Sequence, residues 1–137
     1  MRSFTKGLQI LFVVLLVANS IKSQDVEQQK IFMHVEQMPE FIGGETALIH
    51  FIEANLMYPE QERKEMIQGK VFCSFIVDAF GKVTSPKILR GITNHPNFDA
   101  EVMALLNKMP SWNPGKQNGK AVAVQFSLPI NFLLPKK

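Results

Sequence analysis

The chain has 137 residues, of which 46% are hydrophobic, and its formal net charge is +3 at pH 7. This length suits one small domain and is too short for two ordinary hydrophobic cores. Arg2, Lys6 and Lys22 account for the whole positive excess, so the rest of the chain is near neutral. Nucleic-acid binding usually requires a basic face on the folded domain, and we therefore exclude that function class.

The N-terminal residues have the layout of a secretory signal peptide. Arg2 and Lys6 precede an apolar run from Leu8 to Ala18, and small polar residues follow this run. A transmembrane helix needs roughly 20 apolar residues, and the run is much shorter. We predict an exported chain whose signal peptide, residues 1–23, is removed. The alternative interpretation is an uncleaved membrane anchor.

The next stretch is predicted to lead into a first helix. Residues 24–37 form a flexible or extended lead-in, within which Ile31 to Val35 is either a short strand or an extended arm. Apolar positions then recur at helical spacing from Glu45 to Asn55, which predicts an amphipathic helix that Tyr58-Pro59 ends. The charged residues from Pro59 to Met66 are interpreted as one or two exposed helical turns with a solvated face.

The middle of the chain predicts a β-hairpin. The segment from Gly69 to Val77 is apolar on both faces, which favours a central strand, and Cys73 within it is interpreted as a buried packing residue. Asp78 to Gly81 supplies the turn. The return strand, Lys82 to Arg90, changes phase, and a bulge near Thr84-Ser85 explains the change.

A second helix and a corner follow the hairpin. The apolar stripe from Phe98 to Met109 predicts the helix, and Pro110 ends it. Trp112 is either an exposed recognition aromatic or, as we favour, a corner residue packed over the sheet. The order helix, hairpin, helix, strand predicts an α+β domain in which two helices pack on one face of a three-stranded antiparallel sheet.

The last strand carries the candidate function. Apolar residues alternate along it at Val122, Val124, Phe126, Leu128 and Ile130. Pro129 removes one backbone donor, which is typical of an edge strand. No charged side chain occurs from Ala121 to Phe132, although charge is the usual protection of an exposed edge. Either a partner covers this edge, for example by strand addition, or the protein risks aggregation.

Catalytic motifs are not found in the sequence. The histidines His34, His50 and His95 are scattered without metal-ligand spacing, and there is no nucleophile-elbow or phosphate-loop motif. We predict no catalytic residues, no metal and no cofactor. An enzyme is the least favoured of the three hypotheses considered, behind a peptide-binding module and a structural or regulatory module.

The order of short motifs resembles a known family. These motifs are Phe41-Ile42-Gly43-Gly44, Tyr58-Pro59, Gly69-Lys70-Val71, the turn from Asp78 to Val83, Met109 to Gly115 (MPSWNPG), Gly119-Lys120 and Pro129-Ile130-Asn131-Phe132. Together they resemble the C-terminal domain of TonB, the energy transducer of Gram-negative envelopes, in the form common in the Bacteroidetes. The resemblance implies a domain over residues 38–137, present here as a stand-alone exported module.

The resemblance also implies a location, a partner and a site. It places the chain in the periplasm, with inner-membrane anchoring as the less favoured alternative, and assigns it a role in energy-dependent outer-membrane transport. The partner is a TonB-box peptide of a TonB-dependent outer-membrane transporter, which adds as a strand to the last strand. The implied peptide-binding residues are Ala121, Val122, Ala123, Val124, Gln125, Phe126, Ser127 and Leu128. The alternative is an envelope structural or regulatory module that forms a homodimer, or binds another protein, through the same edge.

Overall fold

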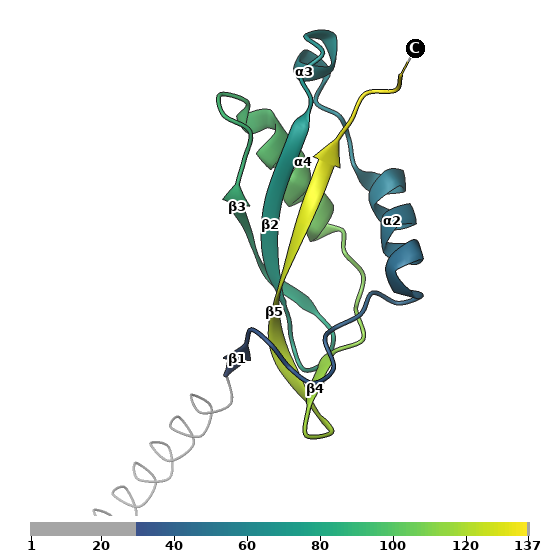
Figure 1. Ribbon diagram of the computed structural model, residues 1–137, viewed down its shortest axis with the longest axis vertical. Coiled ribbons are helices and arrows are strands. Elements are labelled where there is room, and N and C mark those ends of the chain that lie inside the picture. The colour runs from purple at the N-terminus through teal and green to yellow at the C-terminus, as the bar shows by residue number, and fades with distance from the viewer. Residues whose placement is uncertain (1–29, 137) are drawn as a thin grey trace, which may run out of the picture. The chain divides into compact units, whose positions relative to one another are not determined.

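The computed structural model describes residues 30–136. The predicted signal peptide, residues 1–23, and most of the predicted lead-in lie outside these residues. In chain order, the elements are β1 (Ile31–Phe32), α2 (Gly44–Asn55), α3 (Glu60–Lys64), β2 (Gly69–Val77), β3 (Val83–Arg90), α4 (Pro96–Asn107), β4 (Gly115–Gln117) and β5 (Lys120–Phe132) (Figure 1).

The sheet has the strand order β1-β5-β2-β3, and β4 pairs with β5. β2 is antiparallel to β5 from Gly69↔Phe132 to Val77↔Val124, and it is antiparallel to β3 on its other side. This confirms the predicted central strand and the antiparallel core. The pairing of β2 with β3 shifts register between Ser74 and Ile76, and Ser85 opposite this shift has a φ of 52°, which confirms the predicted bulge.

The strand count is higher than the three that the sequence predicted. β1 confirms the short-strand interpretation at Ile31–Phe32, and it runs parallel to β5. β4 was predicted as part of an irregular corner, which is wrong. Asn118 and Gly119 both have positive φ, 52° and 76°, so they form the tight Asn-Gly turn that joins β4 to β5 as a hairpin. β5 therefore begins before its pairing with β2, which is limited by Val77↔Val124, and β4 pairs with this additional part of β5.

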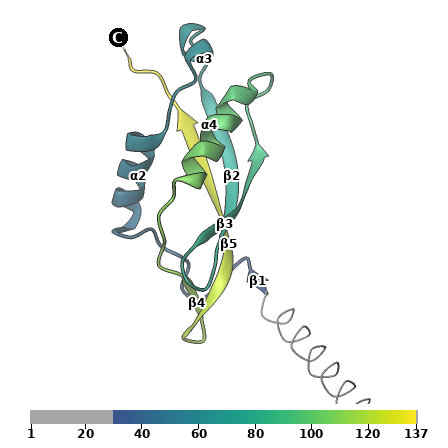
Figure 2. The same cartoon turned by 180° about the vertical axis from the view of Figure 1, so that it is seen from behind.

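Two helices cover one face of the sheet, as predicted. In Figures 1 and 2, α4 lies over β2 and β3 and α2 lies alongside β5, and side chains of both helices belong to the core. The core lies between the helices and the sheet, because the alternate residues of β2 that face the helices are fully buried. They are Val71, Cys73, Phe75 and Val77, each 0% exposed. The predicted packing role of Cys73 is confirmed.

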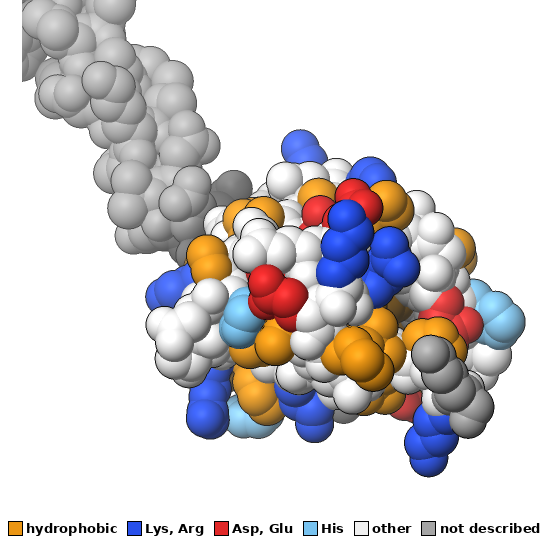
Figure 3. All heavy atoms as spheres, turned by 90° about the horizontal axis from the view of Figure 1, so that it is seen from above, with side chains coloured by type: hydrophobic (Ala, Val, Ile, Leu, Met, Phe, Trp, Pro, Cys, Tyr) orange, Lys and Arg blue, Asp and Glu red, His pale blue; other side chains and the backbone are white. Residues whose placement is uncertain are grey.

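The short helix α3 departs from its predicted solvated character. Glu62 is only 2% exposed. Its carboxylate accepts hydrogen bonds from Asn97 Nδ2 at 3.0 and 3.3 Å, and His95 Nδ1 lies 3.6 Å away. The neighbouring charges do face solvent, and Lys64 pairs with Glu60 at 3.2 Å. At this end of the molecule, acidic and basic side chains are interspersed with hydrophobic ones (Figure 3).

The β2–β3 turn is locked against the Trp112 corner. Gly81 has a φ of 87°, and a Cβ atom there would lie 2.0 Å from the Trp112 carbonyl oxygen. The N–H of Trp112 donates to the Gly81 carbonyl at 2.7 Å. The Trp112 side chain is 3% exposed and packs against Phe41, Phe75 and Phe126. This confirms that the tryptophan packs over the sheet.

Candidate functional site

Side chains alternate strictly along β5, as the sequence predicted. Val124, Ile130 and Phe132 face the helices and are at most 1% exposed. The intervening Ser127, Pro129 and Asn131 are exposed. The apolar positions are therefore used by the core, and a partner that reaches this strand from its edge meets mainly backbone.

The direction of the backbone groups follows from the neighbouring strands. The N–H of Asp78 donates to the Lys82 carbonyl at 2.9 Å, on the β3 side of β2. Successive residues of a strand point their N–H and C=O to opposite edges, so the groups of Val77 point to β5, where its partner is Val124. Even-numbered residues of β5 thus bond β2, and odd-numbered residues point away from it.

The β4 hairpin leads to the same assignment. The N–H of Lys116 donates to the Gln37 carbonyl at 2.8 Å, so it faces away from β5. Its neighbours Gly115 and Gln117 therefore face β5, opposite even-numbered residues again. It follows that β4 and β2 lie on the same side of β5. The other side is the outer edge of the sheet.

The predicted peptide-binding residues divide into two sets by this geometry. Val122, Val124, Phe126 and Leu128 use their N–H and C=O within the sheet, toward β4 or β2. Ala121, Ala123, Gln125 and Ser127 point these groups to the outer edge, and we call these four residues the outer row. The sequence could not make this division, because it depends on which neighbour lies on which side.

Pro129 ends the outer row. It is odd-numbered and pairs with Phe72 of β2, so its missing N–H is one that would have pointed outward. A proline is tolerated there because no bond to β2 is lost. The run of outward donors is therefore interrupted after Ser127.

The outer row is only partly open. At Ala123 and Val124, β1 lies beyond β5, with Ile31 and Phe32 as partners. Among residues 30–136, no strand pairs with the outer side of β5 after Val124. β5 is therefore the edge strand from Gln125 onward, whereas the sequence predicted an edge along its whole length.

Other groups with chemical potential are separated from this edge. Within residues 30–136, no cluster of three or more His, Cys, Asp or Glu side chains is placed to hold a metal ion. His34 and His50 are exposed on different segments. Burial raises the pKa of the Cys73 thiol to about 11, which disfavours the reactive thiolate. The thiol donates to the Leu128 carbonyl at 3.3 Å.

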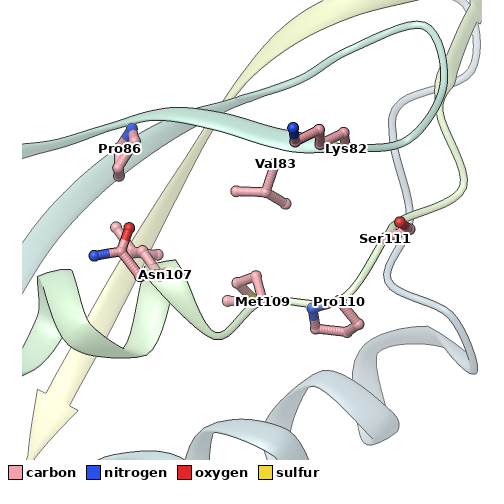
Figure 4. Close-up of a pocket in the computed structure, with 8 residues that line it drawn as sticks. Lys82, Val83, Pro86, Asn107, Met109, Pro110 and Ser111 are labelled. Atoms are coloured by element: carbon pink, nitrogen blue, oxygen red, sulfur yellow. The ribbon is translucent and has the colours of Figure 1, made fainter.

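One pocket lies between β3 and the segment after α4 (Figure 4). Its volume is about 190 Å³, and Lys82 is the only charged side chain in its lining. Pro86, Met109 and Pro110 form part of its wall. A single lysine beside prolines provides no pair of groups for acid–base or nucleophilic chemistry.

Comparison with known proteins places the chain in a family. The family model described as the Gram-negative bacterial TonB protein C-terminal matches residues 54–134. The chain belongs to the TonB C-terminal domain family. Domains of this family are periplasmic and non-catalytic, and they interact with outer-membrane transporters, which supports a TonB-like role in outer-membrane transport. Within residues 30–136, no helix has the length and apolar character needed to span a membrane.

Two solved structures are similar to this TonB C-terminal domain. The Pseudomonas aeruginosa TonB C-terminal domain is 26% identical, with a TM-score of 0.48, over 59% of this chain and 80% of that one. The Helicobacter pylori TonB C-terminal domain is 21% identical, with a TM-score of 0.48, over 67% of this chain and 81% of that one. No curated protein matches the sequence.

Proposed function

We propose that this domain captures a TonB-box peptide of an outer-membrane transporter by strand addition to the outer row of β5, as part of energy-dependent outer-membrane transport. The observation that carries the proposal is the outer row itself: four residues whose N–H and C=O point outward, within the stretch of β5 from Ala121 to Phe132 that has no charged side chain. In strand addition, main-chain hydrogen bonds supply most of the affinity. Family membership supplies the class of partner.

The proposal predicts that binding depends on a backbone donor and hardly on the side chain that carries it. Ser127 is the best position for a test, because its N–H points outward, its side chain is exposed and it lies beyond β1. Ser127→Pro removes that N–H. Pro129 shows that the strand accepts proline at an outward position, so the folding cost should stay below about 1 kcal/mol.

The experiment is a calorimetric titration of a synthetic TonB-box peptide into the parent, Ser127→Pro and Ser127→Ala. We expect Ser127→Pro to lose affinity roughly tenfold or more, with an unchanged circular dichroism spectrum. Ser127→Ala keeps the donor and should bind like the parent. Equal binding by a folded Ser127→Pro variant would show that the outer row is not the docking edge.

The same edge also suits a homodimer, because the uncharged outward groups of two copies can pair with each other. The two functions are separated by size-exclusion chromatography over a range of concentrations. A dimer that the TonB-box peptide does not dissociate, in a chain that fails to bind the peptide, would favour the structural module.

Export to the periplasm with removal of residues 1–23 is the location that this function requires. The support is the short apolar run from Leu8 to Ala18 after two basic residues. N-terminal sequencing of the protein from a periplasmic extract should find a start between Ile21 and Asp25. Intact Met1 in a membrane fraction would favour inner-membrane anchoring instead.

A further inference from the structure

The outer row already has an occupant, and it is a segment of this chain. Val124 pairs with β2 on one side and with Phe32 of β1 on the other, and Ala123 pairs with Ile31. β1 has two residues, runs parallel to β5 and lies in the middle of the residues proposed to receive a peptide (Figure 1). β1 therefore occupies the position that an added strand would take.

The register shows what β1 contributes. Ala123 points outward and is level with Ile31, so in a parallel ladder its C=O lies beside the N–H of Phe32, the residue that follows Ile31. Residues opposite each other place their side chains on the same face. Phe32 thus lies on the helix side, level with the fully buried Val124, and is partly buried, whereas Ile31 is 47% exposed. Phe32 is the anchor of β1.

A second attachment keeps β1 close to this edge. The N–H of Glu36 donates to Gln117 Oε1 at 3.0 Å, and the backbones of Gln37 and Lys116 exchange hydrogen bonds of 2.8 and 3.1 Å. Only the segment Met33–Val35 separates β1 from these bonds to β4. A short tether of this kind gives β1 a high effective concentration at the outer row, even after it detaches.

The pairing of β1 is nevertheless weak enough to exchange. It involves two residues, and the side chains of Ile31 and Met33 are 47% and 56% exposed. Segments with little burial and few hydrogen bonds open locally at small free-energy cost. β1 also lies outside residues 54–134, over which the family is matched.

We propose that β1 is an internal competitor for the outer row. It shields the centre of an uncharged edge in the absence of a partner, and a transporter peptide pairs with the full outer row only after β1 has left. The inference rests on the proposed function. It implies that the apparent dissociation constant of the peptide is the intrinsic one divided by the fraction of molecules in which β1 is detached.

Two matched proline variants of the exported chain test whether the backbone pairing of β1 with β5 affects peptide binding. One variant removes an N–H that points to β5, and the other removes an N–H that points away from it. Phe32→Pro removes a backbone donor that points to β5, together with the anchoring side chain. Ile31→Pro places the same residue one position earlier, where the N–H points away from β5. Both positions lie outside the core, so both variants should fold, and Phe32→Ala is a third variant that weakens the anchor without altering the backbone.

Two measurements are made on the parent and the variants: one of the attachment of β1 and one of the affinity for the peptide. Amide hydrogen exchange without peptide reports β1 directly, because Ala123 pairs with Ile31 of β1. Ser127 has no strand partner on its outer side among residues 30–136, and its amide serves as an internal reference. Calorimetric titration with the TonB-box peptide reports the competition. We expect Phe32→Pro to expose the Ala123 amide and to bind the peptide roughly three- to thirtyfold more tightly than the parent, with Ile31→Pro close to the parent.

The outcomes are distinct. Faster exchange at Ala123 together with tighter binding supports the competitor. Faster exchange with unchanged or weaker peptide binding overturns it and leaves the proposed function intact, because the peptide then binds without displacing β1. An Ala123 amide that exchanges as fast as that of Ser127 in the parent also overturns it. If neither the parent nor any variant binds the peptide, the proposed function fails, and the competitor fails with it.

Discussion

The two outer edges of the sheet are built in opposite ways. β3, at one end of the strand order, contains a bulge at Ser85 with a φ of 52°, a proline at position 86, and the charged Lys87 and Arg90. These are the devices with which proteins prevent edge-to-edge pairing. β5, near the other end, has no charged side chain from Ala121 to Phe132 and keeps a regular pairing register with β2.

This contrast supports the proposal that β5 is the edge at which a partner pairs. A domain that needed only solubility would protect both edges. Here β3 carries protective features from Ser85 to Arg90, whereas β5 is covered over two residues by β1. Detachment of β1 would expose the outer side of β5 at Ala123 and Val124. The comparison therefore favours regulated strand addition at β5 over an edge that is merely unprotected.

The largest expected effect is a loss of folding at an inward position of β5. Leu128 pairs with Cys73 and points its backbone groups to β2, so Leu128→Pro deletes a ladder donor inside the sheet. We expect a loss of roughly 2–4 kcal/mol in the free energy of unfolding, measured by urea denaturation. Ser127→Pro is the matched control, and equal stability of the two variants would contradict the assignment of inward and outward residues.

The second effect concerns the central strand that both edges share. Cys73 is fully buried, and Cys73→Ala should cost about 1 kcal/mol or somewhat more, through lost burial and a small cavity. Peptide affinity should be unchanged, because the outer row is untouched. Since burial raises the pKa of the thiol to about 11, the native parent should react with a thiol reagent slowly at pH 7–8. Rapid labelling would show that this face of β2 is accessible.

Substitutions in β3 are expected to have the smallest effect on stability, and they test the difference between the β3 and β5 edges most directly. Replacing Pro86 and Lys87 together with threonine removes two of the protective features of β3 and makes this edge resemble β5. Both substitutions should change the free energy of unfolding by less than about 1 kcal/mol. Self-association should nevertheless rise with concentration in sedimentation velocity, and the same variant with Pro86 restored should be closer to the parent. A strictly monomeric double variant would indicate that the bulge alone blocks β3.

Local patterns predicted most of the fold. The two amphipathic helices, the hairpin with its bulge, the buried Cys73 and the alternating last strand all follow from side-chain periodicity and from turn residues close in sequence. The β4 hairpin also had a local signal, Asn118-Gly119, and its strand was missed because Lys116 and Gln117 carry no hydrophobic alternation. Glu62 was predicted to be solvated, because its hydrogen-bond partner Asn97 is distant in sequence.

By itself, the sequence determined that the last strand has an apolar face, lacks charge from Ala121 to Phe132 and contains a proline, because these properties belong to individual residues and their period of two. Only the tertiary structure decided which backbone groups point outward, since that depends on β2 and β4 both lying on one side of β5. It alone also brought Ile31 and Phe32 to Ala123 and Val124. Two apolar residues carry no periodic signal, and a pairing between such distant segments is selected by the packing of the whole domain.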